Sequence, residues 1–87
     1  MSIIRLVLDI QKPINLPLNV LAMEISQIEG VGTVDITVQD VDQKVESARV
    51  TIEGPEVDFD RVKATIEKTG VAVQSVDRIT CGKGLAK

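Results

Sequence analysis

The order in which two apolar periodicities follow one another constrains the fold of this chain more than any other feature. Apolar and polar residues alternate in residues 3–10, 31–40, 45–54 and, less regularly, 71–81, and a period of two predicts half-buried strands. Apolar residues recur at helical spacing after the first and third of these segments. The predicted order is therefore strand, helix, strand, strand, helix, strand.

Two strand–helix–strand units with right-handed crossovers give the ferredoxin-like βαββαβ sandwich. This α+β fold has a four-stranded antiparallel sheet of spatial order 4-1-3-2 and two helices on one face. The first and third strands are neighbours, and we expect Arg5 to face Glu53 and Asp9 to face Arg49 on the outer face. Each complementary pair would contribute about 0.2–1 kcal/mol. The inner face in this register pairs Leu6–Ile52, Leu8–Val50 and Ile10–Ala48, and Ile4 extends the same buried row.

Residues that favour helix ends set the expected helix limits. Asn15 is predicted as the N-cap of the first helix, with Pro17 in its first turn and Gly30 as its stop. Asp58 is predicted to cap the second helix, and Asp60 adds favourable negative charge to the first turn. The second helix should bury Phe59, Val62 and Ile66 and stop at Gly70. In the last strand, either Gln74 or Ser75 faces inward or a bulge interrupts the pairing.

Length and charge limit the class of protein and its partners. The 87 residues predict one domain over 1–87, with 82–87 as a flexible tail. A net charge of −3 gives no electrostatic reason to bind nucleic acid or an anionic membrane. One cysteine excludes an intrachain disulfide, and Arg5 and Asp9 interrupt the first apolar run, which argues against a signal peptide. We therefore expect a cytoplasmic protein.

The stretch DITVQDVDQKVE, residues 35–46, combines carboxylates with a predicted hairpin tip. We expect Val41 to face Val45 across the tip and Asp40 to end the inward row. As a calcium loop starting at Asp40, the segment places Val45 where glycine is required and Thr51 where a bidentate glutamate belongs. A solvated hairpin tip is therefore the simpler interpretation. The alternative is a divalent cation such as calcium shared between subunits by Asp40, Asp42 and Glu46.

Other sequence features exclude several kinds of chemistry. The chain has no histidine, which removes the commonest general acid–base and transition-metal ligand. The loop QKPINLP after the first strand carries neither the Cys-x-x-Cys of a metal carrier nor a glycine-rich phosphate loop. The outer sheet face lacks the aromatic residues on which RNA bases stack. Cys81 leaves an enzyme with a reactive thiol as a weak third possibility, and the GKG at 82–84 lacks the other residues of a Walker motif.

The mixed outer face and the two sheet edges favour self-association of so small a domain. The leading hypothesis is a non-enzymatic, homo-oligomeric binding or regulatory module for an unknown small molecule. Ligands of small ligand-sensing domains with this fold sit between subunits, near strand edges and the loop after the first strand. The predicted ligand-binding positions are therefore Lys12, Asn15 and the hairpin tip.

Five segments cover most of the chain: MSIIRLVLDIQKP, EGVGTVDITVQDVD, VTIEG, DFDRVKATIEKTG and SVDRITCGK. Together they resemble a family of small archaeal proteins, the domain of unknown function 211. The resemblance implies a ferredoxin-like fold, a cytoplasmic archaeal setting and homo-oligomers, and it implies no known activity. Family members often carry histidine where this chain has Ile14 and Gln74, so a histidine metal site is not carried over.

Overall fold

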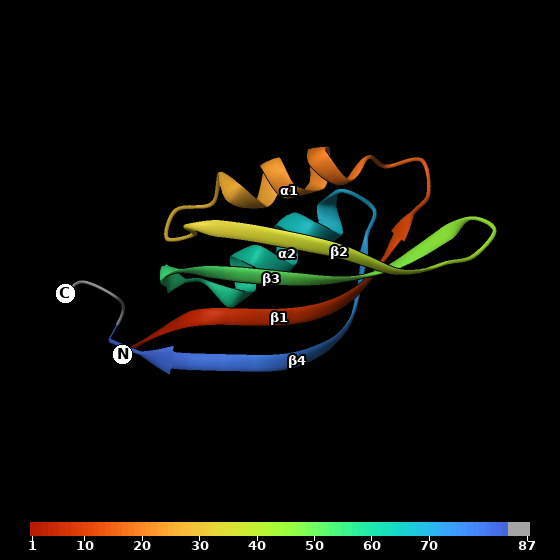
Figure 1. Cartoon of the computed structure of the whole chain (residues 1–87). Coiled ribbons are helices and arrows are strands. Elements are labelled where there is room, and N and C mark those ends of the chain that lie inside the picture. The colour runs from red at the N-terminus through yellow and green to blue at the C-terminus, as the bar shows by residue number, and fades with distance from the viewer. Residues whose placement is uncertain (84–87) are drawn as a thin grey trace.

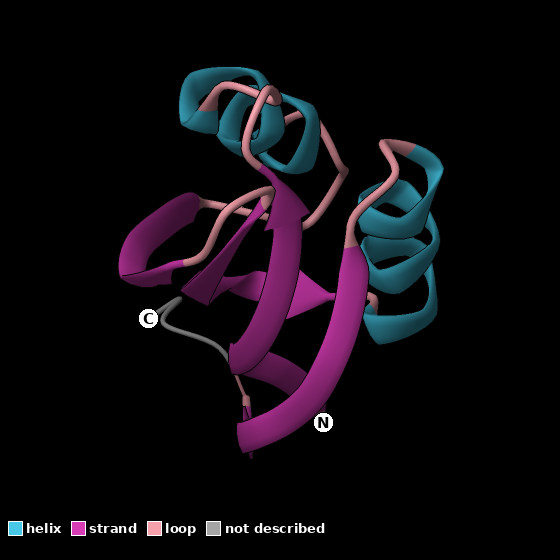
Figure 2. Cartoon of the chain, turned by 90° about the vertical axis from the view of Figure 1, so that its right-hand side faces the viewer, coloured by secondary structure: helices cyan, strands magenta, loops and turns pink. Residues whose placement is uncertain are grey.

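Four strands and two helices follow one another in a computed structural model that describes residues 1–83. The strands are ordered β2-β3-β1-β4 with antiparallel neighbours, which confirms the ferredoxin-like topology. Both helices cover one face of the sheet (Figure 1), and we call the other side the open face. Figure 2 shows how strongly the strands twist. The elements are β1 (Ser2–Pro13), α1 (Leu18–Ser26), β2 (Thr33–Val41), β3 (Val45–Val57), α2 (Phe59–Lys68) and β4 (Ala72–Gly82).

The inner face of the sheet has the predicted register between β1 and β3. Leu6 pairs with Ile52 and Ile10 with Ala48, so the alternating apolar side chains form one continuous row beneath the helices. Burying each such aliphatic side chain contributes roughly 1.5–3 kcal/mol, more than any surface ion pair in this fold. The core consists of Leu6, Leu8, Ile10, Leu21, Ile25, Ile28, Ala48, Val50, Ile52, Val57, Val62, Ile66 and Val71.

The two predicted charge pairs on the open face differ in outcome. Arg5 lies opposite Glu53 and Asp9 opposite Arg49, as predicted. Arg5 Nε is 3.2 Å from Glu53 Oε2, whereas Asp9 and Arg49 form no ion pair in the described structure. The Asp9 Oδ1 atom is buried and has no hydrogen-bond partner within residues 1–83. The register is therefore confirmed, but only one of the two pairs makes contact.

The second helix begins and ends as predicted, and the first does not. Asp58 accepts a hydrogen bond from the Arg61 backbone N–H, and Gly70 follows the last turn of α2 with φ of +93°. The predicted Asn15 cap is wrong, because α1 begins at Leu18 and its N-cap is Pro17, with φ −65° and ψ 144°. Proline disfavours helical geometry at the preceding residue, so Leu16 cannot be the first helical residue after an Asn15 cap. No helix within residues 1–83 is long and apolar enough to cross a membrane.

A bulge in β1 places Ile4 differently from the prediction. Opposite β4, Ile3 pairs with Cys81 and Arg5 with Thr80, so Ile4 has no partner of its own. Ile3 packs against the core, and Ile4 lines a groove on the open face. The prediction that Ile4 extends the buried row is therefore wrong, because a bulge shifts the alternation of side chains by one residue.

A second bulge changes the end of the β2–β3 hairpin. Val38 pairs with Ala48, but Asp40 then pairs with Ser47 and Val41 with Glu46. The predicted Val41–Val45 pair is therefore wrong, because Gln39 is an extra residue in β2. The shift also moves Asp40 from the inner face to the face of Ser47. The hairpin end, residues 39–46, extends past the helices, and we call it the arm (Figure 1).

Two further bulges interrupt the pairing of β4 with β1. Leu8 pairs with Val76 and Ile10 with Val73, which leaves Gln74 as an extra residue. Asp77 is the second extra residue, and it lies between Val76, which pairs with Leu8, and Arg78, which pairs with Val7. Of the two alternatives for the poor alternation of this strand, the bulge is confirmed. β4 also extends to Gly82, one residue into the predicted tail, and the tail residues 84–87 lie outside the described structure.

Candidate functional site

The open face carries rows of side chains that run across all four strands. Toward the N-terminal end of β1 these rows lie beside a groove of about 630 Å³, within the range of roughly 300–1,000 Å³ typical of small-molecule sites. The first row across β2, β3, β1 and β4 is Thr33, Glu53, Arg5 and Thr80, and the second is Asp35, Thr51, Val7 and Arg78. The groove is lined by Ile4, Arg5, Gly32, Thr33, Glu53, Gly54, Pro55, Arg78 and Thr80.

The charged groups of the groove are two arginines and one glutamate. Arg5 Nε and Glu53 Oε2 form an ion pair at 3.2 Å, with side chains 43% and 49% exposed. The Arg5 Nε atom is nevertheless shielded from solvent and has no aligned hydrogen-bond acceptor in the described structure. An ion pair this exposed contributes at most about 1 kcal/mol. Arg78 forms no ion pair within residues 1–83, so the groove keeps one positive charge that is not neutralised locally.

The apolar side of the groove comes from two interruptions in neighbouring strands. The bulge in β1 turns Ile4 onto the open face. Beside it, Gly54 and Pro55 of β3 lie between the residues paired with Ile3 and Arg5. Bulges re-aim side chains and are frequent next to functional sites. The groove therefore combines an apolar wall with a cationic side chain and the hydroxyl of Thr80.

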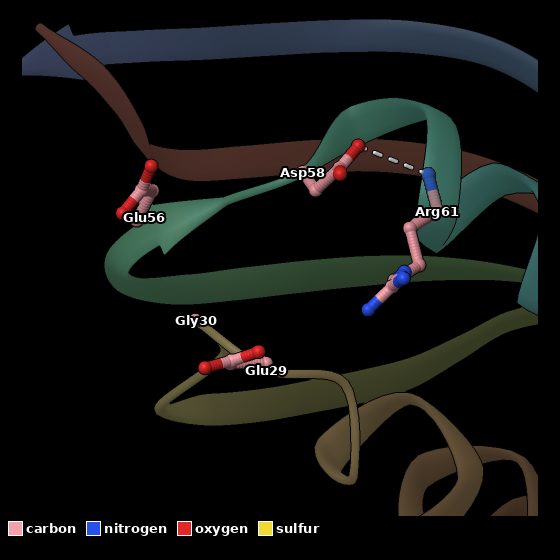
Figure 3. Close-up of a pocket in the computed structure, with 5 residues that line it drawn as sticks. All are labelled: Glu29, Gly30, Glu56, Asp58 and Arg61. Atoms are coloured by element: carbon pink, nitrogen blue, oxygen red, sulfur yellow. Dashed lines mark hydrogen bonds between the residues drawn. The ribbon is translucent and has the colours of Figure 1, made fainter.

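A smaller pocket of about 350 Å³ lies at the start of α2 and is lined by acidic side chains (Figure 3). Asp58 Oδ1 accepts a hydrogen bond from the Arg61 backbone N–H at 3.2 Å, so this carboxylate caps the helix. Glu29 comes from the loop before β2 and Glu56 from the end of β3. Within residues 1–83 no group of three or more Asp, Glu, Cys or His side chains is placed to hold a metal ion. The pocket is best explained as the space beside a capped helix.

The loop before β2 and the end of β3 pack backbone against backbone. Gly32 N donates to Glu53 O at 2.7 Å and Glu56 N to Gly30 O at 3.4 Å. Gly30 has φ of +93°, which glycine adopts readily, and a Cβ on Gly54 would overlap the Gly30 carbonyl oxygen. This contact holds the loop before β2 against the end of β3, and it positions one side of the groove.

Lys12, one of the predicted ligand-binding residues, is buried at the end of β1. Its Nζ contacts Glu46 Oε1 at 2.6 Å and donates to Pro13 O at 2.9 Å and Leu16 O at 2.5 Å. The three N–H donors of the ammonium are thus matched by three acceptors. Its exposure is only 1%, so ligand binding would have to displace one of these contacts. Asn15 is exposed in the loop before α1, and its ligand binding stays a prediction.

The structure does not bring the predicted metal ligands Asp40, Asp42 and Glu46 together within one chain. Asp40 shares the face of Ser47 after the bulge in β2. Asp42 lies in the turn, where its Oδ1 accepts a hydrogen bond from Gln43 N at 2.7 Å. Glu46 is paired with Lys12. A shared cation would therefore need carboxylates from more than one chain.

Cys81, the residue of the weak enzyme hypothesis, is exposed and free near the end of β4. It pairs with Ile3 on β1. The neighbouring GKG segment ends in Gly84, which lies outside the described residues.

Comparison with known proteins gives matches that cover almost the whole chain. Residues 4–87 match the family model of the uncharacterized ArCR proteins, domain of unknown function 211. The chain belongs to this family. An uncharacterized protein of Methanocaldococcus jannaschii is a relative, 37% identical over 79 residues that span 91% of this chain and 81% of the relative. The family resemblance in the sequence is confirmed, and every residue that lines the open-face groove lies within the matched range.

The sequence patterns did not predict the groove of this member of the domain of unknown function 211 family. The dipeptide Gly54-Pro55 inside a strand pattern was the available signal, because both residues mark irregular strand geometry. The alternating pattern ends the third strand at Gly54, whereas β3 in the structure continues to Val57. The position of Arg78 in the groove could not be predicted, because it depends on two bulges in β4 whose positions the pattern leaves open.

Proposed function

We propose that this chain is a non-enzymatic binding module that works as a homo-oligomer. The observation that carries the proposal is the open-face groove, which lies on a sheet face that neither helix covers. Small-molecule sites are concave, largely apolar and lined by a few polar groups. The groove has this composition, with Ile4 and Pro55 beside Arg78 and Thr80.

Exposed apolar side chains at two separate places support self-association. On the edge strand β4, Val76 is 41% exposed and Ile79 is 49% exposed, although both lie opposite core residues of β1. Around the arm, Val41 is 57% exposed and Ile14 is 47% exposed. Uncovered apolar groups on a sheet edge and a projecting hairpin are typical of surfaces that another subunit covers.

An alternative assembly uses a divalent cation between subunits. In this arrangement Asp40 and Asp42 of the arm supply the ligands, because Glu46 is already paired with Lys12. Such an assembly would dissociate when a chelator removes the ion. Assembly through apolar contacts would persist.

Native mass spectrometry of the protein purified without added ligand tests both parts of the proposal. We expect a defined multiple of the single-chain mass, with additional mass from a retained small molecule. A monomer without additional mass would contradict the proposal. An oligomer that dissociates with a chelator and carries one metal ion per contact would favour the alternative.

A further inference from the structure

We propose that the open-face groove binds a small organic monocarboxylate with a short apolar tail. This inference rests on the proposed function and names the ligand class of the binding module. Two properties of the groove support it, namely the charge of its lining and its apolar wall.

The charge of the groove selects an anion. Arg5 is already paired with Glu53 at 3.2 Å, so its charge is locally compensated. Arg78 lines the same groove from the neighbouring strand and has no carboxylate partner within residues 1–83. An arginine side chain can hold a carboxylate through two parallel N–H···O bonds, and the Thr80 hydroxyl lies in the same lining as an additional donor.

The position of Glu53 disfavours a more highly charged anion. Two arginines against one glutamate leave a single positive charge in the lining. A phosphate monoester carries close to two negative charges at neutral pH and would be repelled by the Glu53 carboxylate. A monocarboxylate places one negative charge beside Arg78, which matches the charge left over.

The wall beside these charges requires an apolar group on the ligand. Ile4 reaches the open face only because of the bulge in β1, and Pro55 lies in β3 next to Gly54. Covering an apolar surface with another apolar group contributes about 25 cal/mol per Å². A ligand with a branched aliphatic tail would cover Ile4 and Pro55 while its carboxylate contacts Arg78.

A titration followed by backbone amide NMR tests the site directly. Isocaproate is the probe, because it joins a carboxylate to a short branched tail. We expect shifts confined to amides that line the groove, including those of Gly32, Gly54 and Thr80. Acetate lacks the tail and isoamyl alcohol lacks the charge, so both should bind at least about tenfold more weakly.

Two arginine variants separate this site from general electrostatic attraction. Arg78→Gln should weaken isocaproate binding by about tenfold or more, since a hydrogen bond to a charged group contributes about 1.5–3 kcal/mol. Arg49→Gln is the matched control, because Arg49 is exposed on the same face but does not line the groove. Its affinity should equal that of the unchanged protein. Ile4→Ser should remove the advantage of isocaproate over acetate.

Three results of the titrations would overturn the assignment of a monocarboxylate to the groove. The first is the absence of groove shifts at millimolar isocaproate, and the second is an equal loss in the two arginine variants. The third is tighter binding of inorganic phosphate than of isocaproate at these amides. If a small molecule retained by the purified protein stays bound in Arg78→Gln, the groove assignment fails while the proposed binding module stands.

Discussion

Replacing Lys12 by alanine should cost more stability than any other single change in the polar groups of this fold. The side chain is 2% exposed, and its ammonium contacts three oxygens, Glu46 Oε1 at 2.6 Å, Pro13 O at 2.9 Å and Leu16 O at 2.5 Å. These contacts join the end of β1, the loop before α1 and the arm. Lys12→Ala would leave the Glu46 carboxylate, only 19% exposed, without its counter-charge.

The expected loss follows from the cost of breaking a buried ion pair. Removing one partner of such a pair typically costs about 3–5 kcal/mol, because the other charge stays buried. A chain of 87 residues has a total unfolding free energy of roughly 4–13 kcal/mol at about 0.05–0.15 kcal/mol per residue. Lys12→Ala should therefore remove about a quarter or more of the stability.

A double-mutant cycle separates the ion pair from the loss of packing. Glu46→Gln removes the counter-charge of Lys12 but keeps an oxygen acceptor and the two carbonyl partners for its ammonium, so it should cost less than Lys12→Ala. In the double variant Lys12→Met, Glu46→Leu no charge is left unpaired, so the loss should be much smaller than the sum of Lys12→Met and Glu46→Leu. The coupling between adjacent residues is typically about 0.5–3 kcal/mol.

Urea unfolding followed by far-ultraviolet circular dichroism is the suitable assay. The chain has one phenylalanine and no tyrosine or tryptophan, so intrinsic fluorescence offers no useful signal. Each variant is measured at two protein concentrations, because self-association would make the midpoint depend on concentration. A loss below about 1 kcal/mol for Lys12→Ala, or strictly additive variants, would refute the reasoning.

Four further substitutions test other parts of the structure. Gly54→Ala should destabilise the fold by more than about 2 kcal/mol, because the new Cβ would overlap the Gly30 carbonyl oxygen; unchanged thermal unfolding would contradict the contact between β3 and the loop before β2. Gly70→Ala is its control, with φ of +93° but open space around it, and should cost only about 1–2 kcal/mol. Asp58→Ala should lower the free energy of unfolding by about 1 kcal/mol through loss of the α2 cap, and Asp58→Asn should retain most of it, as urea unfolding would show.

The inner face could be predicted because two independent patterns agree there. The apolar alternation of β1 and β3 and the charges of Arg5, Asp9, Arg49 and Glu53 favour the same register. Every prediction based on alternation alone failed where a bulge occurs, since one extra residue reverses the faces that follow it. This explains the misplacement of Ile4 and of Asp40.

The candidate site could not be predicted for the same reason. All four strands contribute residues to the groove, and its apolar wall exists only because Ile4 is displaced by a bulge. The helix start failed for a different reason, because the effect of Pro17 on the residue before it outweighed the capping preference of Asn15. Lys12 was predicted as a ligand-binding residue from its position after the first strand. Its burial and its contact with Glu46, a residue of the neighbouring strand, could not be predicted from that position.

The bulges of the two outer strands also determine how this protein can avoid fibril growth. An added strand forms a continuous ladder only along a regular edge. Gln74 and Asp77 interrupt β4, and Gln39 interrupts β2, so a strand added along the full length of either border would meet at least one break in the ladder. In the proposed homo-oligomer, contacts between copies would then rely on side chains such as Val76 and Ile79 rather than on a backbone ladder.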